Sequence, residues 1–295
     1  MKILIIGASG FLGFHLLREA LRENTAFDIT ATYNHTKLAL TGVKNFKCDL
    51  CKDKNLSAVI ETVTPDTLIY CAAVASPETC ERHPKLSLAI NTQTPAHIAK
   101  LCYFKGVRFI YTSTDLIFDG ESAPYREDSP PSPINTYGKH KHLAEKSILS
   151  SNPHALICRL PLLYGFCANK KNFTMSVIDS LRANRRVNLF HDEFRTPANA
   201  SDVARFLLQC PPELSGTLHL GGKEIVSRYQ FGGLIAEIFE LNKSLIAATS
   251  QRDIVTSAAR PRDVSLLSEK AFSLGYCPKT VVEGLLKLKE ELRNG

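Results

Sequence analysis

The feature that most constrains the fold of this chain is a glycine-rich turn between its first apolar run and its first helical pattern. Residues 2–6 form a short apolar run, and Gly7, Gly10 and Gly13 follow at intervals of three. Apolar residues then recur with helical spacing from Leu12 to Leu21. A buried strand that leads through such a turn into a helix is typical of a parallel α/β sheet.

Strand and helix patterns keep alternating along the chain. Further buried strands are predicted at 29–33, 68–73, 108–112, 155–160 and 216–220. Because these strands are apolar throughout, they predict a Rossmann-like, doubly wound parallel sheet covered on both faces. We expect residues 1–164 and 196–222 to form this α/β domain. Residues 165–195 and 223–295 are expected to form a smaller, mainly helical lobe.

The glycine turn also predicts a binding site. Glycines allow close backbone approach, and the free N–H groups at the start of a helix attract a pyrophosphate. The spacing is G-x-x-G-x-x-G rather than G-x-G-x-x-G, so a plain strand-to-helix turn is the alternative, but the position after the first strand favours a dinucleotide. The candidate cofactor residues here are Gly7, Ser9, Gly10, Phe11, Leu12 and Gly13.

The end of the second predicted strand bears on the choice of cofactor. An NAD-selective site usually offers a carboxylate there, whereas Asn34, His35 and Lys37 stand at this point. We therefore expect NADP(H) to be preferred and NAD(H) to be accepted, a polar surface loop being the alternative. Asp49 and Leu50, after a third predicted strand, are candidates for contact with adenine, although Asp49 also suits a simple turn.

Charge and cysteine content narrow the class of function. Lysines and arginines number 36 against 29 acids, a net charge of +7, but they are dispersed, which favours a phosphate-bearing small ligand over nucleic acid. Nine cysteines without paired spacing, and no apolar stretch suited to a signal peptide or membrane span, lead us to expect a cytoplasmic protein. Cys48 and Cys51 lack a second pair of zinc ligands, so no metal site is expected.

Tyr137 and Lys141 lie four positions apart, after a proline-rich loop. In a helix they share one face, where the ammonium is expected to lower the pKa of the phenol toward neutrality. Such a phenol supplies the proton that reduction of a ketone requires at the emerging alkoxide. For an isolated Y-x-x-x-K, a solvated pair is the alternative.

Nine segments, in order along nearly the whole chain, carry a family resemblance. They are GASGFLG at Gly7, CAAVASPETCE at Cys71, YTSTDLIFDG at Tyr111, PYRED at Pro124, SPINTYGKHKHLAEK at Ser132, RLPLLYG at Arg159, FRTPANASDVAR at Phe194, GTLHLGG at Gly216 and RPRDVSL at Arg260. The set resembles the extended short-chain dehydrogenase/reductases, and more narrowly the dTDP-4-dehydrorhamnose reductase family.

The resemblance implies roles for individual residues. Tyr137 would be the catalytic acid, Lys141 its partner and a ligand of the nicotinamide ribose, and Thr114 the hydroxyl that holds the substrate oxygen. Ser113 is the alternative hydroxyl, and Asn91 stands where related enzymes place an asparagine that supports a proton relay, a capping or core role being the alternative. Further cofactor contacts are expected from Cys71, Ala72, Ala73, Thr112 and Tyr137 itself.

On the substrate side, the resemblance implies that arginine clamps a diphosphate. Arg260 is the leading candidate for this clamp, and a surface or salt-bridging arginine is the alternative. Asp115 follows Thr114 in the substrate loop, and Leu162 stands where several rhamnose reductases have an aromatic residue. The other arginines considered are Arg186, Arg195 and Arg262, and the aromatic residues available for stacking are Tyr164, Phe166, Phe173 and Phe190.

The resemblance therefore implies an NAD(P)H-dependent reductase of a 4-keto-6-deoxy nucleotide sugar in polysaccharide biosynthesis of the dTDP-rhamnose type. The need for Mg²⁺ and a homodimeric state stay open. The alternatives are an epimerase, a dehydratase or another reductase of sugar nucleotides, and a non-catalytic NADP-binding subunit resembling the regulatory subunit of methionine adenosyltransferase. Leu116 follows Asp115 where the dehydratases have a second acid, so reduction is favoured.

Overall fold

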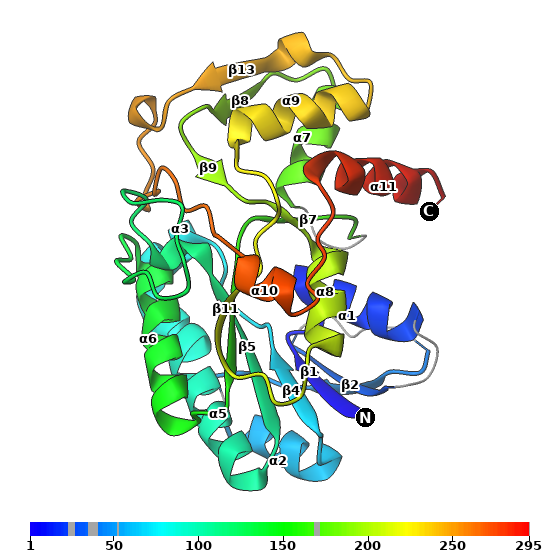
Figure 1. Cartoon of the computed structure of the whole chain (residues 1–295), viewed down its shortest axis with the longest axis vertical. Coiled ribbons are helices and arrows are strands. Elements are labelled where there is room, and N and C mark those ends of the chain that lie inside the picture. The colour runs from blue at the N-terminus through cyan, green and yellow to red at the C-terminus, as the bar shows by residue number, and fades with distance from the viewer. Residues whose placement is uncertain (23–26, 35–40, 52, 168–171, 295) are drawn as a thin grey trace.

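The computed structural model describes residues 1–22, 27–34, 41–51, 53–167 and 172–294. Its centre is a seven-stranded sheet in the order β11-β6-β5-β4-β1-β2-β3, with every neighbouring pair parallel (Figure 1). Its strands are β1 (Lys2–Ile6), β2 (Asp28–Tyr33), β3 (Lys44–Lys47), β4 (Thr67–Tyr70), β5 (Arg108–Thr114), β6 (Leu156–Leu160) and β11 (Gly216–His219). The predicted Rossmann-like parallel sheet is confirmed.

Helices cover both faces of this sheet. Those that follow the strands are α1 (Phe11–Arg22), α2 (Asp53–Val63), α3 (Pro77–Arg82), α4 (Pro84–Leu88), α5 (Thr94–Lys105), α6 (Thr136–Ser151) and α8 (Ala200–Gln209). Two short turns complete this part: the π-helical η1 (Ala89–Gln93) and the 3₁₀ turn η2 (Asp115–Ile117).

The alternation of side chains along β1 explains why its whole run is apolar. Ile3 and Ile5 face a core built with α1 and α8, whereas Leu4 and Ile6 face a second core built with α2, α5 and α6. All four side chains are buried, and each contributes about 1.5–3 kcal/mol of transfer free energy to folding. A strand with two buried faces has no place for an alternating polar residue.

A third core lies beyond the carboxyl edge of the sheet. It is built from Tyr164 and from α7 (Phe173–Arg182), α9 (Arg228–Ile238) and α11 (Val281–Asn294). The parallel pair β8 (Val187–Phe190) and β13 (Ile246–Thr249) packs with α9 (Figure 1). The remaining short elements are β7 (Leu163–Tyr164), β9 (Phe194–Arg195), β10 (Ala198–Asn199), β12 (Val226–Ser227), η3 (Lys243–Leu245), η4 (Gln251–Asp253) and α10 (Glu269–Ser273).

Two strand ends differ from the prediction, and both differences shape the carboxyl edge of the sheet. β4 ends at Tyr70 rather than at 73, because Tyr70 pairs with Ile6, the last residue of β1, and the chain then leaves the sheet. β5 instead continues to Thr114, which pairs with Leu160 of β6. Residues 71–73 and Thr114 therefore meet at the edge where parallel sheets bind their ligands.

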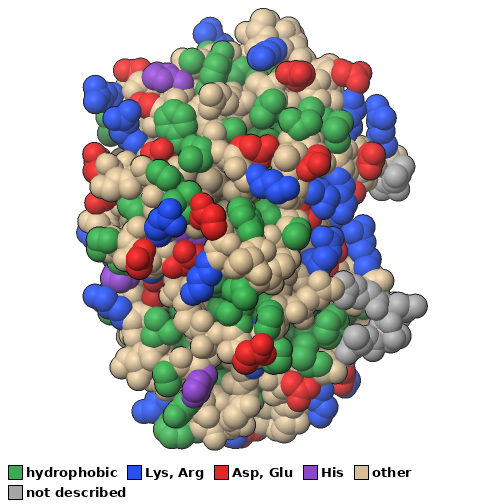
Figure 2. Space-filling model, viewed as in Figure 1, with side chains coloured by type: hydrophobic (Ala, Val, Ile, Leu, Met, Phe, Trp, Pro, Cys, Tyr) green, Lys and Arg blue, Asp and Glu red, His purple; other side chains and the backbone are tan. Residues whose placement is uncertain are grey.

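The surface bears out the dispersed charge seen in the sequence. Figure 2 shows Lys and Arg side chains interspersed with Asp and Glu over the visible face. Among the described residues, no helix is long and apolar enough to cross a membrane.

Candidate functional site

The glycine turn brings β1 against the end of β4. Gly7 has a φ of +87°, and the Gly10 amide donates a 2.9 Å hydrogen bond to the Gly7 carbonyl. A Cβ at Gly7 would lie 2.6 Å from the backbone nitrogen and Cα of Ala72. Only glycine combines this backbone conformation with this close approach, and the result is a cradle open to a phosphate.

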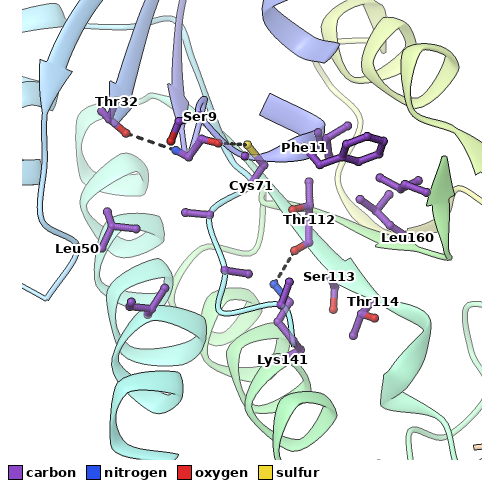
Figure 3. Close-up of a pocket in the computed structure, with 18 of the residues that line it drawn as sticks. Ser9, Phe11, Thr32, Leu50, Cys71, Thr112, Ser113, Thr114, Lys141 and Leu160 are labelled. Carbon is purple, nitrogen blue, oxygen red and sulfur yellow. Dashed lines mark hydrogen bonds between the residues drawn. The ribbon is translucent and has the colours of Figure 1, made fainter. Parts of the chain in front are cut away.

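The cradle opens into a cavity of about 540 Å³ at the carboxyl edge of the sheet (Figure 3). The predicted cofactor residues that line it are Gly7, Ser9, Gly10, Phe11, Leu12, Asn34, Leu50, Cys71, Ala72, Ala73, Thr112, Tyr137 and Lys141. The segments that follow β1, β2 and β4, together with the end of β5, thus line one cavity. Its position over the turn, and the small side chains of Ala72 and Ala73, suit a nicotinamide dinucleotide.

Two predicted cofactor residues that the structure describes lie elsewhere. Gly13 packs against the Gly7 carbonyl behind the turn and does not line the cavity. Asp49 accepts a hydrogen bond from the Cys51 amide, at 3.0 Å, as a turn residue does. His35 lies outside the described residues, as does Lys37.

The helix that carries the Tyr-Lys pair is fixed at its first turn. Asn135 caps α6 by accepting a 2.8 Å hydrogen bond from the Gly138 amide. Glu81 of α3 accepts from the amide and the hydroxyl of Thr136, at 2.8 and 2.7 Å. Gly138 lies so close to the Leu116 carbonyl that a Cβ there would overlap it. These contacts press the start of α6 against the loop that follows β5.

Lys141 is buried, with 2% of its surface exposed. Its ammonium donates a 2.7 Å hydrogen bond to the Thr112 carbonyl (Figure 3) and lies 4.0 Å from the centre of the Tyr111 ring. Burial lowers the pKa of Lys141 to about 7, and the Glu145 carboxylate opposes this shift. The positive charge therefore points into the sheet edge.

The Tyr137 phenol does not have the lowered pKa that its spacing from Lys141 predicts. Burial raises its pKa above the ordinary value of 10, and the negative charge of Asp115 raises it further, against a hydrogen bond from Thr114. The prediction was wrong because helical spacing places the two side chains on one face without fixing where the ammonium points. In the ligand-free protein the phenol keeps its proton.

The Thr114 hydroxyl interacts with the phenol, and its hydrogen bonds differ from those of the neighbouring Ser113. Thr114 donates to Asp115, at 3.1 Å, and accepts from the Leu116 amide, at 3.2 Å. The buried Ser113 hydroxyl has no partner among the described groups. Thr114 and Tyr137 each line two cavities, whereas Ser113 lines only the first.

The second cavity, of about 340 Å³, holds the predicted substrate residues Thr114, Asp115, Leu162 and Arg260. Three further charged residues line it: Glu193, Arg195 and Arg228. Burial raises the pKa of Asp115, and the guanidinium of Arg195, 3.5 Å away, opposes the shift. Glu193 and Arg228 were missed in the sequence; the one signal was the position of Glu193 directly before the FRTPANASDVAR segment.

Other residues singled out in the sequence have structural roles or lie outside both cavities. The Asn91 side chain accepts from the Val74 amide, at 2.9 Å, and donates to its carbonyl, at 3.1 Å, which fixes the loop after β4. Burial raises the pKa of the Cys71 thiol to about 12, so it is not a nucleophile. Arg186 and Arg262 are exposed and line neither cavity.

Within the described ranges, no group of three His, Cys, Asp or Glu side chains could hold a metal ion.

Comparison with known proteins identifies the family. The family model for the RmlD substrate binding domain matches residues 1–291. The chain belongs to this family. The predicted resemblance to the dTDP-4-dehydrorhamnose reductases is thus confirmed.

The proteins similar to this chain are of different kinds. Methionine adenosyltransferase 2 subunit beta of Xenopus laevis is 30% identical over 288 residues, which cover 95% of this chain and 84% of that protein. A probable low-salt glycan biosynthesis reductase of Haloferax volcanii is 30% identical over 295 residues, covering 98% and 97%. A dTDP-4-dehydrorhamnose reductase of Clostridium acetobutylicum matches with a TM-score of 0.86 and 26% identity, covering 99% of this chain and 100% of that one.

Proposed function

We propose that this chain is a reductase that uses NADPH, or NADH less well, to reduce the ketone of a 4-keto-6-deoxy nucleotide sugar. The observation that carries the proposal is that Tyr137 and Thr114 line both cavities. A proton donor and a second hydroxyl therefore stand at the junction of a dinucleotide-sized cavity and an arginine-lined one.

The chemistry follows from this placement. A nicotinamide in the first cavity would supply a hydride to a carbonyl carbon held in the second. Tyr137 would donate a hydrogen bond to the carbonyl oxygen, and Thr114 would do so once its hydroxyl turns away from Asp115. The raised pKa of Tyr137 keeps its proton in place until the alkoxide forms. Lys141 lines the first cavity and would bind the nicotinamide ribose there.

The choice of NADPH rests on the charge of the first cavity. No carboxylate lines it within the described residues, and Asn34 stands at the end of β2. A 2′-phosphate would therefore meet no repulsion there. In the same proposal, residues 1–164 and 196–222 hold the cofactor, and 165–195 with 223–295 contribute Glu193, Arg195, Arg228 and Arg260 to the substrate.

The test is reduction of a dTDP-4-keto-6-deoxy sugar by the purified chain, followed as loss of NADPH absorbance. Tyr137→Phe should lower kcat by at least about 100-fold and leave the Kd for NADPH within about twofold. Tyr103→Phe, at an exposed tyrosine outside both cavities, is the matched control and should keep full activity. Absence of turnover with both NADPH and NADH refutes the substrate class, and an active Tyr137→Phe refutes the acid.

The similarity to methionine adenosyltransferase 2 subunit beta, 30% over 95% of the chain, favours a second candidate function. As a regulatory subunit, the chain would bind a methionine adenosyltransferase catalytic subunit rather than reduce a sugar. Size-exclusion chromatography of the two proteins mixed together tests this candidate. A stable complex with altered synthetase activity, combined with no ketone reduction, would support it, and separate elution would exclude it.

A further inference from the structure

Arg260 lines the second cavity and forms ion pairs with two carboxylates, of which that of Glu78 is the nearer. Its Nη2 donates to Oε1 of Glu78 at 2.5 Å, while its Nη1 lies 3.7 Å from Oε2 of Glu193. Its Nε is buried and has no hydrogen-bond partner among the described groups. The edge formed by Nε and Nη2 is thus occupied by a single carboxylate oxygen, although it has the geometry to bind two.

The other two arginines of the cavity are bound more firmly. Arg228 donates to Glu193 at 2.8 Å, and Arg195 lies 3.3 Å from the same carboxylate and 3.5 Å from that of Asp115. Glu193 is 1% exposed, so separating it from these arginines would leave charges unpaired in the interior. An incoming anion is therefore not expected to displace these pairs.

The pair of Glu78 with Arg260 lies nearer the solvent. The two side chains are 31% and 34% exposed, and pairs with this exposure contribute little to stability. Glu78 belongs to the short helix α3, where the Ser76 hydroxyl also donates to it, at 3.0 Å. If Arg260 were released, the Glu78 carboxylate could turn to water and keep the Ser76 hydrogen bond.

We propose that Glu78 is a specificity-determining residue. Its carboxylate binds the same edge of Arg260 that a phosphate oxygen of the ligand binds. This inference rests on the proposed function, since it assigns Arg260 to the diphosphate of the nucleotide sugar. Glu78 lowers the affinity for every anion that uses this edge. It discriminates most against singly charged or neutral ligands, because only a multiply charged phosphate exceeds a carboxylate in its attraction to a guanidinium.

The test is a double-mutant cycle read by the Kd for dTDP, measured calorimetrically on the NADPH-loaded full chain. Glu78→Gln should tighten dTDP binding about fivefold, which corresponds to one exposed ion pair no longer being displaced. Arg260→Met should weaken binding about tenfold or more, and adding Glu78→Gln to Arg260→Met should then change nothing. Glu121→Gln removes an exposed acid that lines neither cavity and should leave the Kd unchanged.

The outcomes separate the role of Glu78 from the proposed function. An unchanged or weakened Kd in Glu78→Gln, or equal tightening in Glu121→Gln or in the Arg260→Met background, overturns it, because the effect would then not pass through Arg260. If the cycle behaves as expected but no keto sugar is reduced, the reductase proposal fails alone. If the sugar is reduced normally and Glu78→Gln leaves the Kd for dTDP unchanged, the role of Glu78 fails alone; absence of dTDP binding in every variant overturns both.

Discussion

Replacing Lys141 by methionine should stabilise the ligand-free protein at acidic and neutral pH. The side chain is 2% exposed, and no carboxylate in the described part of the chain lies within ion-pair distance of its ammonium. Its pKa falls from the ordinary 10.5 to about 7 through burial. At about 1.4 kcal/mol per pKa unit, the buried charge costs the folded state about 5 kcal/mol well below pH 7.

The sign of the pH dependence follows from proton binding in the two states. Between pH 7 and 10.5 the unfolded chain still binds a proton at Lys141 and the folded chain does not, so the stability of the wild type rises with pH. The advantage of Lys141→Met should therefore shrink by about 3 kcal/mol from pH 6 to pH 9. The variant also loses the hydrogen bond to the Thr112 carbonyl. This loss lowers the stability advantage of Lys141→Met by about 1 kcal/mol at every pH.

Urea unfolding of the ligand-free, reduced protein, followed by circular dichroism at pH 6, 7.5 and 9, measures this difference. Lys146→Met, at an exposed position of the same helix, is the control and should give a pH-independent difference. A stability difference for Lys141→Met that stays constant over this pH range, or that grows toward pH 9, would refute the reasoning. The expected result would mean that Lys141 is kept in spite of its cost to folding.

Two further predictions concern the frame around the site. Gly7→Ala should cost about 2–4 kcal/mol of unfolding free energy and abolish NADPH binding, measured by urea unfolding and NADPH fluorescence, because both the positive φ and the contact with Ala72 exclude a Cβ. Gly275→Ala, with a φ of +92° and nothing near its Cβ, should show the backbone strain alone and bind NADPH normally; equal losses in the two variants would contradict the contact argument. Glu145→Gln should lower the free energy of unfolding by about 3–5 kcal/mol. The reason is that the buried guanidinium of Arg159, 2.9 Å from Glu145, loses its charged partner. The same variant should move the pH-dependent region of Lys141 to lower pH, and unchanged unfolding curves at pH 6 and 9 would contradict it.

The parallel sheet and its glycine turn could be predicted because both depend on local sequence patterns. Strands buried on two faces are continuous apolar runs, and a turn with positive φ at its first position needs glycine at Gly7. The helical Tyr137-Lys141 pair follows equally from spacing. What depends on burial could not be predicted: the pKa of Tyr137 rises because the fold excludes water and points Lys141 toward Thr112.

The ion pairs at the second cavity also could not be predicted from sequence patterns. Glu193 and Arg228 are 35 positions apart, and Glu78 and Arg260 are 182 apart. No periodicity links such residues, because their contact arises only when the segments after β8 fold back over the carboxyl edge of the sheet. Arg260 could be proposed from the family resemblance, whereas its partner on α3 could not.

The contact of Gly138 with the Leu116 carbonyl limits how the site can move. With no side chain between them, helix α6 and the loop after β5 are in direct contact, so the backbone positions of Tyr137 and Thr114 relative to each other depend on this packing. Any larger residue at position 138 would push the start of α6 away from this loop, and Tyr137 would move with it. Substitutions among the arginines of the second cavity need not disturb this contact, because it is made by Gly138 and the Leu116 carbonyl alone.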